Sequence, residues 1–73
     1  MDKTIAVEMI LSELSFATSK FGKFNSTHEG YAVILEELDE LWEQIKLNGT
    51  QAELAKEATQ VTAMGLRFLM DLC

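Results

Sequence analysis

Residues 26–53 read STHEGYAVILEELDELWEQIKLNGTQAE, and this stretch holds the signals that divide the chain into helices. It opens with Ser-x-x-Glu and closes with Thr-x-x-Glu, and both patterns fit the capping box that begins a helix. In such a box the hydroxyl of the first residue accepts the amide proton of the glutamate. The glutamate carboxylate in turn accepts the amide proton of the first residue. We therefore predict that helices begin beside Ser26 and Thr50.

Asn48-Gly49 lies between the two boxes and predicts the end of a helix, because glycine takes the left-handed cap conformation without a Cβ penalty. The chain has no proline, and its apolar residues recur at spacings of three and four. These features predict three helices, at roughly 3–20, 27–47 and 51–72.

The composition describes one small domain that spans residues 1–73. The chain carries 12 acidic residues against 6 basic ones, and 48% of its residues are hydrophobic. A domain of this size buries only about 60% of its unfolded surface, so its core contributes little stability. Its single cysteine, Cys73, provides no disulfide framework and suits a reducing, cytoplasmic setting. We therefore expect metal binding or self-association to stabilise the fold.

Charge and hydropathy exclude two classes of partner. Six dispersed bases under a net charge of −6 make a poor surface for nucleic acid, whose recognition rests on Lys and Arg at the phosphates. No segment approaches the roughly 20 apolar residues that a membrane span needs. We expect a soluble protein that binds neither nucleic acid nor membrane.

The apolar residues predict amphipathic helices that carry more apolar surface than one small core can cover. The first helix carries two nearly opposite stripes: Ala6, Val7, Ile10, Leu14 and Ala17 on one, and Ile5, Met9 and Phe16 on the other. The second helix carries one face: Tyr31, Ile34, Leu38, Leu41, Trp42 and Ile45. The third also carries one: Leu54, Ala58, Val61, Gly65, Phe68, Leu69 and Leu72. We predict an all-α, antiparallel three-helix chain that completes a four-helix-type bundle by oligomerisation, as a dimer or a tetramer.

Residues 36–43, EELDELWE, concentrate carboxylates beside the apolar face of the second helix. At about 100° per residue, Glu37 and Glu40 project along one line beside that face. Glu57 and Gln60 lie one turn apart on the third helix, so antiparallel packing can set the two rows opposite each other. Clustered carboxylates repel and attract a cation, and oxygen ligands suit Mg²⁺ or Mn²⁺.

Two segments, NSTHEGYAVILEELDELW at 25–42 and KEATQVTAMGLRFL at 56–69, resemble the MazG-like all-α nucleotide pyrophosphohydrolases, in particular short phage and mobile-element members. The family signature is E-E-x-x-E on one helix and E-x-x-D on the next. Residues 36–40 match the first part fully. In the second part Glu57 matches, and Gln60 stands where the family usually has aspartate. The resemblance covers roughly residues 20–72 and identifies the chain as one MazG-like helical domain.

The resemblance implies Mg²⁺-dependent hydrolysis of a nucleoside triphosphate, ribo or deoxy, to the monophosphate and pyrophosphate. It assigns Glu37, Glu40 and Glu57 as catalytic metal ligands and puts Gln60 in the fourth ligand position. Glu36 becomes an additional catalytic ligand or the base that orients water. Such a site is chemically reasonable, because water can approach a polyphosphate only where cations offset the negative charge.

Further side chains are candidates for substrate binding. Asn25 could contact a base edge or a sugar hydroxyl, and Trp42 could stack on the base. Lys56 and Arg67 could meet a phosphate, although a single base on a helix more commonly faces solvent. The carboxylates themselves also have a structural alternative, an acidic helix face in solvent that pairs weakly with Lys46 or Lys56.

Gln60 leaves a second function open. An amide oxygen can bind Mg²⁺ but brings no formal charge, so the site would hold the ion less firmly than the family pattern does. The alternative is a non-catalytic helical oligomer, derived from the same family, that binds a nucleotide or a protein partner.

Overall fold

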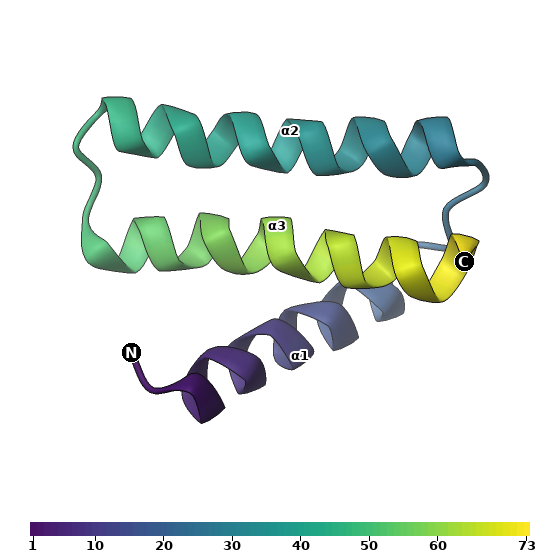
Figure 1. Ribbon diagram of the computed structural model, residues 1–73, viewed down its shortest axis with the longest axis horizontal. Coiled ribbons are helices and arrows are strands. Elements are labelled where there is room, and N and C mark those ends of the chain that lie inside the picture. Colours follow the sequence, from purple (N-terminus) through teal and green to yellow (C-terminus); the bar gives the residue numbers. More distant parts are fainter.

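The computed structural model describes residues 1–73 and contains three α-helices and no strand (Figure 1). Helix α1 spans Lys3–Lys20, α2 spans Thr27–Lys46 and α3 spans Gln51–Leu72. The predicted all-α class is confirmed. The predicted helix bounds differ from the observed ones only at the end of α2, which stops one residue earlier. No helix combines the length and the apolar character needed to span a bilayer.

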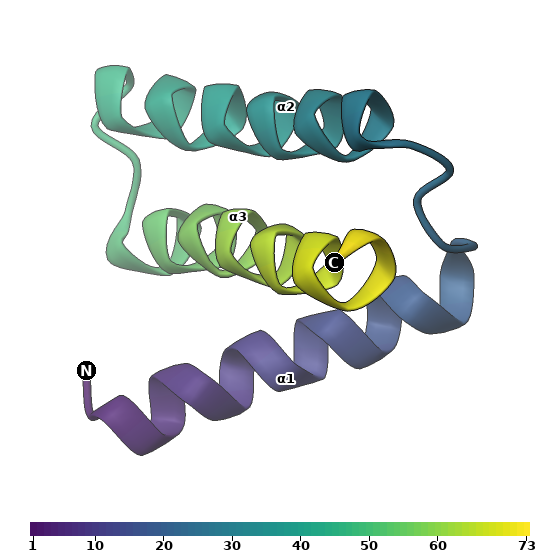
Figure 2. The same ribbon diagram turned by 45° about the vertical axis from the view of Figure 1, so that its right-hand side comes forward.

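Helix α3 is the central helix. Helices α2 and α3 run antiparallel and side by side, and α1 crosses α3 on another side (Figures 1 and 2). Helices α1 and α2 do not pack on each other. The arrangement leaves α1 and α2 each with only one neighbouring helix.

The capping residues explain where α2 and α3 begin. At α3 the predicted box is complete, since Glu53 N donates to Thr50 Oγ1 at 3.1 Å and Thr50 N donates to Glu53 Oε2 at 3.0 Å. At α2 only half of the prediction holds. Glu29 N donates to Ser26 Oγ at 3.1 Å, but the Glu29 carboxylate accepts from Asn25 N at 2.9 Å instead of from the Ser26 amide. The carboxylate thereby ties down the loop before α2.

The turn after α2 corrects a second prediction. Asn48, not Gly49, takes the left-handed conformation, with φ 55°. Asparagine tolerates this region better than most residues. A Cβ at Gly49 would lie 2.5 Å from Gln44 Oε1 and 3.2 Å from Gln44 O. A side chain at this position would therefore crowd the backbone at the end of α2, which glycine avoids.

The buried core is small and lies around α3, against which α1, α2 and the first loop each pack. It consists of Ala17, Phe24, Ala63 and Met64, with Ile10, Val33, Ile34, Phe68 and Leu72 partly buried around it. The chain exposes 5189 Å² of surface, whereas a compact monomer of 8.2 kDa exposes about 4,500 Å². Much apolar surface therefore remains open to solvent.

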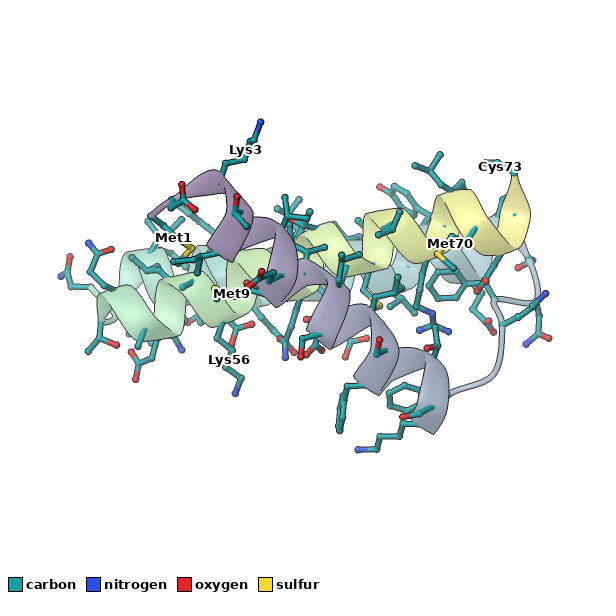
Figure 3. The ribbon with its side chains drawn as sticks, turned by 90° about the horizontal axis from the view of Figure 1, so that it is seen from below. Met1, Lys3, Met9, Lys56, Met70 and Cys73 are labelled. Atoms are coloured by element: carbon teal, nitrogen blue, oxygen red, sulfur yellow. The ribbon has the colours of Figure 1, made fainter.

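Helix α1 shows which of its predicted stripes α3 covers. Ala17 is buried and Ile10 packs against the core, both from the first stripe. From the second stripe, Ile5 and Phe16 are 52% and 56% exposed. Met9 lies partly buried where α1 crosses α3 (Figure 3). Because α3 is the only helix that packs on α1, it covers only part of the apolar surface of α1.

The predicted single face of α2 is in fact two faces. Ile34 and Leu41 are partly buried, whereas Tyr31, Leu38, Trp42 and Ile45 are exposed. The cause is the width of the predicted face, which exceeds the arc that the single neighbour α3 covers.

Two helical glycines give a matched test of the α2–α3 contact. A Cβ on Gly30 would lie 2.7 Å from Phe68 Cδ2 and 3.0 Å from Leu72 Cδ1, so we expect Gly30→Ala to destabilise the fold by about 1 kcal/mol. Gly65 has no atom within 4 Å of such a Cβ, so Gly65→Ala should stabilise α3 by about 0.5–1 kcal/mol. Urea unfolding measures both changes. If both variants changed the free energy of unfolding in the same direction, the result would contradict this packing.

Candidate metal centre

Three of the four predicted metal ligands meet between α2 and α3. Glu37 and Glu40 lie one turn apart on α2, and Glu57 lies opposite them on α3. One carboxylate oxygen from each of the three lies within 4.8 Å of the others. We call these residues the carboxylate trio. Antiparallel packing of two helices brings them together, as their spacing in the sequence predicts.

Gln60, the fourth predicted ligand, lies against the same carboxylates. With its amide nitrogen turned toward them, it donates to Glu37 Oε2 at 3.1 Å and to Glu57 Oε2 at 3.2 Å. With the amide turned by 180°, its oxygen takes that place and adds a fourth oxygen to the trio. The first orientation suits a cluster without a cation, and the second suits a cluster around one.

The electrostatics of the trio favour a cation or a proton. Partial burial, with the charges of Glu40, Glu57 and Glu36 and a hydrogen bond to Glu40, raises the pKa of Glu37 from 4.5 to about 7. Burial and the charge of Glu40 also raise the pKa of Glu57, and nearby Lys56 opposes this rise. No lysine or arginine forms an ion pair with the trio. Its negative charge is therefore not neutralised by a direct ion pair.

The donor set fits a hard divalent cation. It consists of carboxylate and amide oxygens, which Mg²⁺ and Mn²⁺ prefer over the nitrogen and sulfur ligands typical of zinc. Around one octahedral Mg²⁺ with bonds of about 2.1 Å, adjacent oxygens lie about 3.0 Å apart and opposite oxygens about 4.2 Å apart. The trio oxygens lie within 4.8 Å of one another, so they are close enough to converge on one ion as the side chains draw together.

A cleft of about 850 Å³ opens beside the trio, a volume typical of pockets for small ligands. Glu36, Glu37 and Gln60 line one part of it, and Asn25 and Glu29 line another. Bases come from α1 and the loop after it: Lys20 and Lys23. The cleft thus connects the metal candidates with Asn25, one of the predicted substrate-binding residues.

The other two predicted substrate-binding residues do not line the cleft. Trp42 is 55% exposed, and the Lys46 ammonium lies 5.8 Å from the centre of its ring. Lys56 lines a separate groove between α1 and α3 and projects away from both helices (Figure 3). Lys46 pairs with Glu43 at 3.1 Å at the surface, as the acidic-face alternative predicts for that part of α2, whereas neither Lys46 nor Lys56 forms an ion pair with the trio.

Arg67 does not face solvent as a single base on a helix commonly does, because it is only 4% exposed. Its Nη2 donates to Gly22 O at 2.6 Å, and its guanidinium lies 4.3 Å from the centre of the Phe24 ring. Its Nε lies 3.9 Å from Asp71 Oδ2, which accepts the Phe24 amide proton at 3.1 Å. Arg67 and Asp71 thereby hold the α1–α2 loop, one wall of the cleft, against α3.

Asp71 is the residue that sequence reasoning missed at this end of the cleft. Its i, i+4 spacing from Arg67 was the available signal, since such pairs share one helix face. That signal indicates a pair but not its burial, which depends on the loop that folds over it.

Comparison of the chain with family models, with curated proteins and with solved structures gives no match. The resemblance of residues 20–72 to the MazG-like enzymes stays a prediction that rests on the motif residues themselves.

Proposed function

We propose that this chain is a divalent-cation-dependent nucleotide pyrophosphohydrolase, which converts a ribo- or deoxyribonucleoside triphosphate to the monophosphate and pyrophosphate. The observation that carries the proposal is the carboxylate trio, three carboxylates from two helices that form no ion pair and adjoin a cleft of about 850 Å³. Glu37, Glu40 and Glu57, with the amide oxygen of Gln60, would hold Mg²⁺ or Mn²⁺.

The surrounding residues support this chemistry in different ways. A bound divalent ion would neutralise phosphate charge and lower the pKa of a water molecule. Glu36 lies at the edge of the cleft next to Glu37, where its carboxylate can orient that water or accept its proton. Asn25 can hydrogen-bond a base or a sugar, and Lys20 and Lys23 add positive charge for the phosphates. Lys56 and Trp42 have no such place in the cleft.

A panel of nucleoside triphosphates tests the proposal. We expect pyrophosphate release from at least one ribo- or deoxyribonucleotide with Mg²⁺ or Mn²⁺, above a blank in which EDTA removes the metal. Monophosphate should appear in equal amount, which separates this reaction from stepwise loss of inorganic phosphate. A panel without product above the blank would contradict the enzymatic function.

One observation favours the second candidate, a non-catalytic module that binds a nucleotide or a protein. The Gln60 amide can donate to Glu37 and Glu57 at once and so stabilise the trio without metal. In that case Mg²⁺ has no effect on the thermal unfolding midpoint.

We propose further that the chain works as a homo-oligomer, a dimer or a tetramer, in a reducing cytoplasmic setting. The exposed apolar residues of α1 and α2 support association with another copy. The single cysteine supports the reducing setting.

A further inference from the structure

Helix α2 carries a second apolar face that no part of this chain covers. Its five large side chains follow one another at spacings of four, three, four and three, and each is 40–65% exposed: Tyr31, Leu35, Leu38, Trp42 and Ile45. We call this row the α2 seam. Alternating spacings of four and three are those of a coiled-coil contact, in which one helix packs along another. None of the five residues lines the cleft beside the trio.

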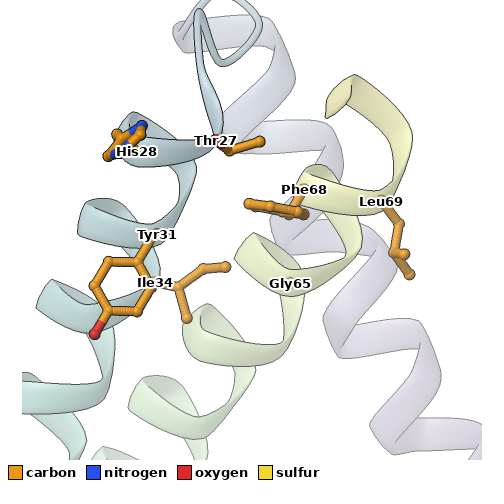
Figure 4. Close-up of a pocket in the computed structure, with 7 residues that line it drawn as sticks. All are labelled: Thr27, His28, Tyr31, Ile34, Gly65, Phe68 and Leu69. Atoms are coloured by element: carbon orange, nitrogen blue, oxygen red, sulfur yellow. The ribbon is translucent and has the colours of Figure 1, made fainter. Parts of the chain in front are cut away.

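The seam continues into a groove between α2 and α3 (Figure 4). The groove has a volume of about 630 Å³ and is mainly apolar; its lining includes Tyr31, Ile34, Phe68 and Leu69. At its floor Gly65 has no side chain, and no atom lies within 4 Å of where its Cβ would be. Leu69 on the opposite wall is 62% exposed. Seam and groove form one apolar surface across α2 and α3.

The exposed surface area indicates how large a contact with a partner would be. The chain exposes 5189 Å², against about 4,500 Å² for a compact monomer of its mass. The excess is close to the roughly 800 Å² that each partner loses in a dimer of standard size. An uncharged row of this length would promote aggregation if it stayed in water.

A second copy of this chain fits the surface better than an unrelated partner. A two-fold axis across the seam places the same apolar row on both sides of the contact, so the surface complements itself. The row is also symmetric about its middle residue: in an antiparallel pair centred on Leu38, Tyr31 lies opposite Ile45 of the partner subunit, so each copy covers the whole seam of the other.

We propose that the α2 seam, with its adjoining groove, is the surface on which a second copy docks, α2 packing antiparallel on α2. The contact leaves the carboxylate trio and its cleft outside the interface. It identifies the surface used by the homo-oligomer and does not depend on metal binding or hydrolysis.

Two matched substitutions test the interface. Leu38 on the seam and Leu11 on α1 are 48% and 49% exposed, so lysine at either position costs the single chain about equally. We expect multi-angle light scattering at micromolar concentration to show an oligomer for the wild type and for Leu11→Lys. For Leu38→Lys the mass should fall to half or less, with circular dichroism confirming its helix content. Dissociation by Leu11→Lys but not by Leu38→Lys would overturn the proposal, as would a monomeric wild type.

Trp42, the only tryptophan, gives an independent readout in the unmodified chain. It is 55% exposed in the single chain, and the proposed contact buries it. Dilution should therefore shift the fluorescence maximum of the wild type to longer wavelength as the dimer dissociates. This readout also decides the case if Leu38→Lys fails to fold. Emission that stays constant while the mass falls on dilution would place the interface elsewhere and overturn the proposal.

Discussion

Arg67→Met is expected to lower the free energy of unfolding by about 3 kcal/mol or more, because it leaves a buried carboxylate without its cation. Asp71 has a side chain only 8% exposed, and Arg67 supplies the one positive charge beside it. Methionine also loses the hydrogen bond from Arg67 to Gly22 O and the stacking of the guanidinium on Phe24. For a domain of this size such a loss is a large part of its total stability.

Chemical denaturation of Arg67→Met beside Lys46→Met measures the effect. Lys46 pairs with Glu43 at the surface, where both side chains are about half exposed, so its loss should change stability by less than about 0.5 kcal/mol. The double variant Arg67→Met with Asp71→Leu should recover part of the loss, because the unpaired charge is gone. Similar losses for Arg67→Met and Lys46→Met would contradict the buried pair.

The boundaries between consecutive helices were predictable because local chemistry sets them. Ser26, Thr50 and Asn48-Gly49 mark boundaries through caps and turn conformations that involve neighbouring residues only. Two details of these boundaries differ from the prediction, because more than one nearby residue can fill each local role. The Glu29 carboxylate bonds to Asn25 instead of Ser26, and Asn48 takes the left-handed conformation assigned to Gly49.

The trio was predictable for a different reason. The i, i+3 spacing of Glu37 and Glu40 puts both on one side of α2, and antiparallel packing brings in Glu57 from α3. The burial of Arg67 was not predictable, since it depends on the α1–α2 loop, which folds over α3 through contacts that join distant residues. The packing of α1 and α2 on different sides of α3 is a tertiary outcome of the same kind.

Glu37→Gln is expected to raise stability in the absence of metal at pH 8 by about 1–2 kcal/mol. The folded chain raises the pKa of Glu37 from 4.5 to about 7, so the folded state binds more protons than the unfolded state between these values. Stability from this group is therefore fully present below pH 4.5 and falls as the pH rises through 7. Glu57 has the same direction of shift. Because Glu37 is only partly buried, we expect the gain in stability to be smaller than its full pKa shift implies.

Magnesium should reverse this loss in the wild type. An ion bound only by the folded state, at a concentration 100 times its dissociation constant, adds about 2.7 kcal/mol of stability. Thermal unfolding from pH 4 to 8, with and without Mg²⁺, should therefore show a rise in midpoint that grows with pH. Glu37→Gln should flatten the pH dependence measured without metal and abolish the rise. Pyrophosphate release should be lost in Glu37→Gln and in Glu40→Gln.

Glu43→Gln is the matched control, because Glu43 lies on α2 but outside the trio and pairs with Lys46. It should keep both the magnesium effect and the pH dependence of the wild type. If Glu37→Gln retains the magnesium effect, the ion binds elsewhere and the trio is not the site. If the wild type shows no effect at millimolar Mg²⁺ while Glu37→Gln still stabilises the fold, repulsion among the carboxylates is real but no cation relieves it. In that case Gln60 has replaced the ion as the partner of Glu37 and Glu57, and the chain is the non-catalytic module.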